Sequence, residues 1–230
     1  MNNENKFKKT LIWLFIIALC FAGSVILKNI AFQDSPLSNH MTLEDLQTMN
    51  IRVSYIEDSE DWTDEWYDMY CDSQIEGAKT CEYILVGKPT GNIYFNRGTI
   101  LQEIYVEYVI KGDCTYQKIW IQNGLKSTLK YKKGEVILSG MDRSLMQQDC
   151  EYLLFCDAMS ANEYSDKKVY TEADAMWFGC YNLSRDSNIV MKQNEDLYNS
   201  QIEFYTSSDR TLELYNNTKH KLINKYIYEK

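Results

Sequence analysis

The chain is poor in histidine and has none of the short motifs that mark common catalytic sites. His40 and His220 are its two histidines, and it has no CxxC pair, so a zinc site is poorly supported. A Ser-His-Asp or Cys-His site would have to use one of these two residues. No GxSxG, Walker or HExxH motif occurs. A two-carboxylate hydrolase is the remaining enzymatic alternative, but 33 acidic residues supply candidate pairs by chance. We therefore expect no enzymatic activity, no cofactor and no metal.

Basic residues are also scarce outside the N-terminus. The net charge is −9 over 230 residues. Residues 1–30 contain four lysines and one glutamate, so the remainder has 20 basic against 32 acidic residues, a net charge of −12. A domain this acidic repels phosphate backbones, which excludes nucleic acid as an expected partner.

The first thirty residues predict on which side of the cell membrane the rest of the chain lies. Three lysines (Lys6, Lys8 and Lys9) precede an uncharged, mostly apolar run of seventeen residues, 11–27. About seventeen apolar residues is the lower limit for a helix that spans a bilayer. Lysines before the run place the N-terminus in the cytoplasm and the rest of the chain outside. We favour an uncleaved signal anchor that holds a single-pass protein in the cell membrane. A signal peptide cut near Val25, which would release a secreted protein, and a lipoprotein signal at Cys20 are the alternatives.

Six cysteines follow this segment, an even number that suits disulfides outside the cytoplasm. The spacing and the expected strand ends favour the pairs Cys71–Cys81, Cys114–Cys150 and Cys156–Cys180, provided that each brings its Cα atoms within about 4.4–6.8 Å. Several buried thiols are the alternative interpretation.

The residue pattern predicts a mainly β fold with some helix. Residues 82–113 form the centre: a short apolar run, a connection with Pro89 and Gly91, and an alternating segment over 99–111 that predicts a long hairpin. Further strands are expected at 116–123, 135–139, 151–156 and 175–183, and an amphipathic helix from Asp209 onward. We divide the chain into an anchor or signal peptide (1–30), a tether with a short helix (31–50), an antiparallel barrel (51–190) and a C-terminal helical extension (191–230).

Residues 57–72 form the most acidic stretch, with eight carboxylates. Such clusters suit calcium or a cationic partner, because hard cations prefer carboxylate ligands. The EF-hand pattern is absent, and Trp62 and Trp66 recur at helical spacing. A solvated helix face is therefore the favoured interpretation.

The order of these pieces resembles a known family. A short helix leads into EYILVGKPTG, a long strand ends in VIKGD, and a later strand reads DCEYLLF. Over residues 70–185 this resembles the netrin-like and metalloproteinase-inhibitor-like OB barrels, especially their bacterial extracytoplasmic forms. The resemblance implies an OB-like β-barrel with a short helix before the central hairpin. The zinc-chelating N-terminal cysteine of the animal inhibitors has no match, since Cys71 lies about forty residues beyond the apolar run. The usual turn glycine is replaced by Gln148-Asp149-Cys150.

Together these observations predict a non-catalytic binding or interaction module for a peptide, protein or glycan. An accessory structural subunit of a membrane complex is the alternative. OB barrels bind ligands in grooves crossed by aromatic side chains. The candidate ligand-facing aromatics are Tyr94, Phe95, Tyr105, Tyr108 and Trp120, with packing inside the barrel as the other interpretation.

Overall fold

The protein is described from a computed structural model. The described residues are 13–20, 22–24, 37–49, 51–54, 63–96, 99–122, 128–132, 135–139, 144–159, 167–186, 188–190, 196–197, 202–206 and 208–229. The chain divides into two units, residues 1–37 and 38–230. In the first unit, residues 13–20 and 22–24 are helical, with most of their side chains exposed. Within the described ranges, no helix is both long and apolar enough to cross a membrane.

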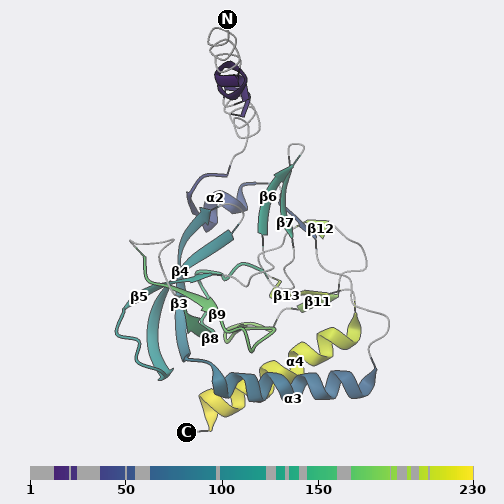
Figure 1. Ribbon diagram of the computed structural model, residues 1–230. Helices are drawn as coiled ribbons and strands as arrows, with labels where there is room; N and C mark the ends of the chain where they lie inside the picture. Colours follow the sequence, from purple (N-terminus) through teal and green to yellow (C-terminus); the bar gives the residue numbers. More distant parts are fainter. Residues whose placement is uncertain are drawn as a thin grey trace, which may run out of the picture. The chain divides into compact units, whose positions relative to one another are not determined.

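The second unit is built on a closed barrel of five strands (Figure 1). Its strands are β3 (Tyr83–Asn96), β4 (Thr99–Lys111), β5 (Lys118–Gln122), β8 (Tyr152–Ala158) and β9 (Val169–Glu172). Around the barrel they follow the order β3-β4-β5-β9-β8, and β8 pairs with β3 to close it. Four of these pairings are antiparallel, whereas β5 and β9 run parallel. The predicted hairpin and antiparallel barrel are therefore confirmed, with one parallel pair added.

Alternation along the strands separates the inside of the barrel from its outside. The inside is filled by buried apolar side chains, among them Leu85, Ile104, Ile119, Ile121 and Leu154. Gln102 also points inward and is 1% exposed. Its side-chain amide donates to the Met146 carbonyl and accepts from the Met146 N–H, both at 2.9 Å. A polar side chain is tolerated there because two backbone groups satisfy its amide in the core.

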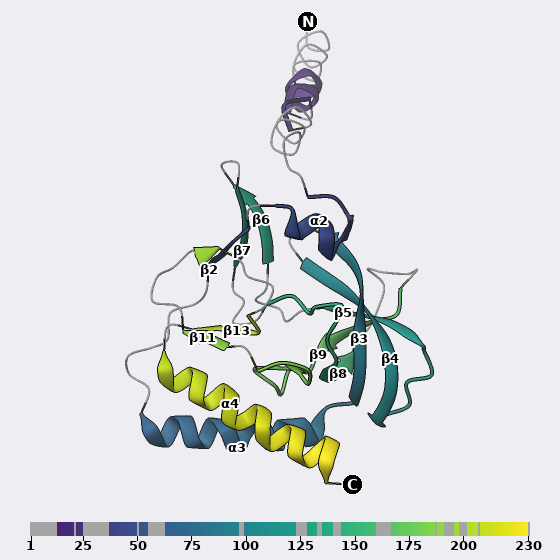
Figure 2. The ribbon, with the colours of Figure 1, turned by 180° about the vertical axis from the view of Figure 1, so that it is seen from behind.

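Two helices cover the outside of β3 and β8. They are α3 (Asp64–Thr80) and α4 (Asp209–Ile223), and a π-helical turn η1 (Asn224–Tyr228) continues α4. They lie side by side beneath the barrel in both ribbon views (Figures 1 and 2). A second core, between the helices and the outward residues of β3 and β8, includes Ile84, Val86, Phe155, Phe178 and Tyr215. The helices are capped by Thr63 and Ser208, whose hydroxyls accept from Trp66 N and Thr211 N.

The remaining strands form smaller sheets and extensions. β1 (His40–Thr42) pairs with the far end of β3, and β10 (Cys180–Asn182) pairs with β8. A four-stranded sheet has the order β12 (Asp196–Leu197), β2 (Ile51–Ser54), β7 (Glu135–Ser139) and β6 (Thr128–Lys132). β11 (Asn188–Val190) and β13 (Phe204–Thr206) form a parallel pair. The short helix α2 (Leu43–Gln47) begins with a capping box between Thr42 and Asp45.

Candidate functional site

The outward side chains of β3, β4 and β5 form a face that we call the outer barrel face. Its central residues are Tyr94, Glu103, Tyr105, Lys118 and Trp120. Register places Glu103 opposite Trp120 and Tyr105 opposite Lys118, so these four side chains stand together on one side of the sheet. Tyr105 is 39% exposed. Tyr94 and Trp120 are half-buried and pack against buried Leu101 and Val169.

The aromatic rings on this face contact one another and two lysines. The Tyr94 and Trp120 ring centroids are 6.4 Å apart in an edge-to-face arrangement. Lys167 Nζ lies 4.6 Å from the Tyr94 centroid and 5.5 Å from that of Trp120, and Lys168 Nζ lies 5.0 Å from the Tyr116 ring. Cations over aromatic faces are attracted by the ring quadrupole. The face therefore combines ring surfaces with ammonium donors.

Glu103 is held ionised at the centre of this face. Its Oε2 accepts hydrogen bonds from Thr90 Oγ1 at 2.7 Å and Asn92 Nδ2 at 2.8 Å, and Lys118 Nζ lies 3.6 Å away. Burial alone would raise the pKa of Glu103, but these hydrogen bonds and the Lys118 charge outweigh it and hold the pKa below its usual value. Nearby, Gln117 Nε2 donates to the Tyr105 hydroxyl at 2.8 Å. The face thus presents rings, donors and a fixed carboxylate, the groups that recognise a polar ligand with apolar patches.

Three of the five predicted ligand-facing aromatics meet here: Tyr94, Tyr105 and Trp120. Phe95 lies opposite Ile100 and so belongs to the other face of β3. Tyr108 is 40% exposed but lies beyond a register shift in the β3–β4 pairing, opposite Val86. Lys167 and Lys168 were missed, because the short strand that follows them was not recognised in the sequence.

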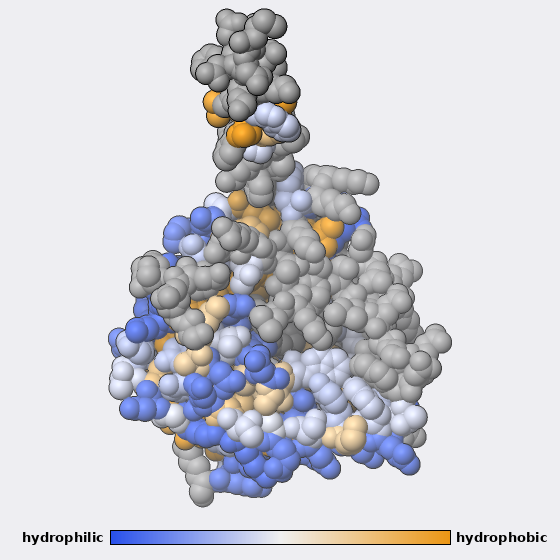
Figure 3. Space-filling model, viewed as in Figure 1, coloured by the Kyte–Doolittle hydropathy of each residue, from blue (hydrophilic) through white to orange (hydrophobic). Residues whose placement is uncertain are grey.

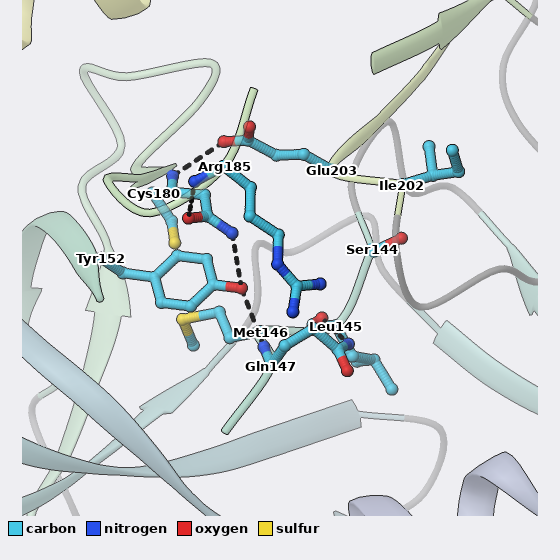
Figure 4. Close-up of a pocket in the computed structure, with 10 residues that line it drawn as sticks. Ser144, Leu145, Met146, Gln147, Tyr152, Cys180, Arg185, Ile202 and Glu203 are labelled. Carbon is cyan, nitrogen blue, oxygen red and sulfur yellow. Dashed lines mark hydrogen bonds between the residues drawn. The ribbon is translucent and has the colours of Figure 1, made fainter. Parts of the chain in front are cut away.

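A second polar site lies beside β10, around a small hollow with a cavity volume of about 20 Å³, enough for water (Figure 4). Ten residues line it: Ser144, Leu145, Met146, Gln147, Tyr152, Cys180, Asn182, Arg185, Ile202 and Glu203. The Tyr152 hydroxyl accepts from Gln147 N at 2.8 Å and from Asn182 Nδ2 at 3.2 Å. Burial is the main cause that raises the pKa of Tyr152, so its hydroxyl stays protonated.

Glu203 connects this hollow to helix α4. Its Oε1 accepts from Asn182 N and from the Tyr215 hydroxyl, both at 2.7 Å, and its Oε2 lies 2.7 Å from Lys219 Nζ. Lys219 Nζ also donates to the Arg185 carbonyl and to Asp186 Oδ1. Both oxygens of the carboxylate and the whole ammonium group are engaged. Because the Glu203 carboxylate and the Lys219 ammonium group have all their hydrogen-bond partners, they stabilise the junction of α4 with the barrel.

The structure contains none of the three predicted disulfides. All seven are thiols in the structure, and no disulfide links any described pair. Cys71 lies within α3 and Cys81 caps its end, so about 15 Å of helix separates them. Cys180 is opposite Leu154 in the β10–β8 pair, which leaves Cys156 at a diagonal position about 7–8 Å away between Cα atoms. Cys114 instead contacts the Tyr170 hydroxyl, whereas Cys150 lies beside Asp149. The predicted Cys71–Cys81 pair assumed that the two ends of a short helix could approach each other, whereas a continuous helix holds them apart.

The acidic stretch is only partly described. Residues 57–62 lie outside the described residues, whereas Glu65, Asp68 and Asp72 are exposed on α3. Across the described ranges, no three histidine, cysteine or acidic side chains converge in a way that could hold a metal ion.

Comparison with known proteins gives no family assignment. No protein-family model matches the chain, and no curated protein matches it.

Proposed function

We propose that this chain is a non-catalytic binding module with an OB-like barrel, and that its ligand occupies the outer barrel face. The strand order supports the OB-like interpretation. Counting β3, β4, β5, β8 and β9 as strands one to five, the barrel order is one-two-three-five-four, with strands three and five parallel. The resemblance to netrin-like domains has the same support, together with the helix that precedes β3.

The position of the aromatic side chains carries the proposal. OB barrels bind ligands on the face of their second and third strands, which correspond here to β4 and β5. Tyr105 and Trp120 stand on that face beside Glu103 and Lys118. The net charge of −9 disfavours an oligonucleotide. An oligosaccharide or a peptide fits the combination of ring surfaces with paired donors and acceptors.

The proposed location rests on the sequence pattern. The apolar run 11–27 after Lys6, Lys8 and Lys9 supports a single-pass anchor in the cell membrane, with the barrel on the extracytoplasmic side. Protease added to intact cells should digest the barrel unit, whereas protection until lysis would contradict this orientation.

The binding proposal is tested with glycan and peptide arrays. The labelled full chain, in a mild non-ionic detergent, is applied to both arrays, and each hit is measured again with Tyr105→Ala and Trp120→Ala. We expect at least a tenfold loss of affinity in each variant, because stacked aromatic rings dominate such sites. Tyr228→Ala, which removes an aromatic side chain that is 74% exposed on η1, is the matched control and should bind normally. The proposal would be contradicted if the array ligands bound both variants as tightly as the parent, or if no ligand bound on either array.

A further inference from the structure

A second aromatic surface lies on α3, away from the outer barrel face. Trp66 and Tyr70 stack with ring centroids 4.7 Å apart and an interplanar angle of 17°. Trp177, from the loop after β9, meets the Tyr70 ring edge-on at 4.7 Å and the Trp66 ring at 6.3 Å. All three side chains are half-buried, and Met69 beside them is 61% exposed. We call Trp66, Met69, Tyr70 and Trp177 the α3 aromatic patch.

The α3 aromatic patch lies over the second core, against which Trp177 packs. Beneath it, Phe178 is buried and stacks on Trp177 at 5.1 Å, and the core continues from Phe178 to Phe204 and Tyr215. The loop is held in place by a hydrogen bond from Trp177 N to Gln74 Oε1 at 2.6 Å. Large aromatic and methionine side chains that remain at the surface on a fixed framework are typical of protein interaction sites.

Carboxylates follow the same helix alongside the patch. Glu65, Asp68, Asp72 and Glu76 are exposed and recur at intervals of three or four residues, which places them on one face of α3. With 3.6 residues per turn, Met69 lies between this acidic row and the row of Trp66 and Tyr70. In Figure 3 the surface over α3 is accordingly mostly hydrophilic, with paler areas among the blue. Around its circumference the helix thus presents first the acidic row, then Met69, then the row of Trp66 and Tyr70.

Two carboxylates of the acidic row have cationic partners. Asp72 lies 3.6 Å from Lys221 Nζ, and Glu76 pairs with Lys79. Within the described part of the chain, no lysine or arginine forms an ion pair with Glu65 or Asp68. A helix dipole favours an acid in the first turn, which accounts for Glu65 but not for the exposed Met69 near it. The uncompensated charge therefore coincides with the most exposed apolar part of the patch.

We propose that the α3 aromatic patch docks an arginine- or lysine-bearing segment of a partner protein. The aliphatic stem of such a side chain fits on Met69 and Trp66, and its charged end reaches Asp68 or Glu65. Arginine suits the site best, because its guanidinium stacks on aromatic rings and pairs with carboxylates. The chain already contains this interaction at the edge of the patch, where the Arg210 guanidinium lies 4.7 Å from the Tyr67 ring centroid.

The test uses the full chain in non-ionic detergent with three fluorescein-labelled peptides: hexa-arginine, hexa-lysine and hexa-glutamate. Fluorescence anisotropy gives the affinity of each in about 50 mM and 200 mM salt. We expect hexa-arginine to bind more tightly than hexa-lysine, hexa-glutamate not to bind, and affinity to fall with salt. The double variant Glu65→Gln with Asp68→Asn should lose at least tenfold in affinity for hexa-arginine, as should Trp66→Ala.

The matched control changes the net charge by the same amount elsewhere. Glu44→Gln with Asp113→Asn removes two exposed carboxylates that do not belong to α3 and should bind within twofold of the parent. Equal losses in the two double variants would mean that net charge alone attracts the peptide, which would overturn the proposal. Failure of hexa-arginine to bind the parent would do the same. If Trp66→Ala instead abolished a concentration-dependent dimer, the occupant would be a second copy, and the proposed partner would be wrong.

Discussion

Lys219 Nζ lies 2.7 Å from Glu203 Oε2, and the two side chains are 3% and 6% exposed. The pair joins α4 to the segment that enters β13, beside the hollow lined by Tyr152 and Arg185. An ion pair this deep contributes to stability only while all its groups are hydrogen-bonded, and here Tyr215, Asn182 and the Arg185 carbonyl complete it.

Removal of Lys219 should therefore destabilise the protein strongly. Lys219→Ala leaves the buried Glu203 carboxylate without its ion-pair partner, and we expect the free energy of unfolding to fall by about 3–5 kcal/mol. Urea denaturation followed by circular dichroism measures this. Lys79→Ala, which breaks an exposed ion pair with Glu76, should change it by less than about 1 kcal/mol. If the free energy of unfolding fell by a similarly small amount in both variants, the buried ion pair would not contribute to stability.

Acidification should weaken the same junction. Burial tends to raise the pKa of Asp186, but the hydrogen bond and charge of Lys219, together with His220, outweigh it and hold the pKa below its usual value. A carboxyl with a lowered folded-state pKa stabilises the protein above its unfolded pKa, and this contribution disappears as pH falls through the folded value. The free energy of unfolding should therefore decrease below about pH 4. The decrease should be smaller in Asp186→Asn than in Asp113→Asn, measured by urea denaturation at pH 5 and pH 3. Equal decreases would exclude a role for Asp186.

Two buried thiols should resist alkylation in the folded protein. Burial raises the pKa of Cys81 to about 11 and that of Cys156 well above its usual value. At pH 8 about one Cys81 side chain in a thousand is a thiolate, the reactive form. Iodoacetamide followed by non-reducing peptide mapping should leave both residues unmodified until the protein is unfolded in guanidinium. A disulfide-linked peptide that contains either residue would contradict the thiol assignment.

Gly77 should be required where α3 meets the loop after β9. A Cβ atom at Gly77 would lie 2.4 Å from the Ala175 carbonyl oxygen, a contact that forces the backbone apart. Alanine gains up to about 1 kcal/mol in helix propensity, but we expect Gly77→Ala to lower the free energy of unfolding by about 1–3 kcal/mol overall. Ser73→Ala, on the exposed side of α3, should change it by less than about 0.5 kcal/mol. A stabilised Gly77→Ala variant would show that the helix and loop do not touch as described.

Local patterns in the sequence were enough to predict the central hairpin and the C-terminal helix. Alternation over residues 99–111 marked β4, and Leu212, Tyr215 and Leu222 marked α4. The strand β9 was missed because it has four residues and follows a polar stretch. Its role comes from parallel pairing with β5, about fifty residues earlier, and no local pattern reports such a contact. Closure of the barrel was therefore predicted from the family resemblance and not from the sequence of β9.

The candidate site was predictable only in part, again because local patterns do not report contacts between distant strands. Tyr105 and Trp120 could be placed outward because alternation assigns faces within one strand. Tyr108 is exposed as well, but a register shift in the β3–β4 pairing places it opposite Val86, away from the residues around Glu103. The contact of Lys167 with Tyr94 and Trp120 depends on the position of β9 and was not foreseen.

The central claim is that the outer barrel face binds the ligand, and chemical-shift mapping tests it most directly. A ligand selected on the arrays is titrated into the isotope-labelled full chain in detergent, and amide and aromatic shifts are followed. The account predicts that the largest changes fall on Tyr94, Tyr105 and Trp120 and their strand neighbours, with α3 unchanged. Changes centred on the hollow beside β10 or on α3, with the outer barrel face unperturbed, would contradict it.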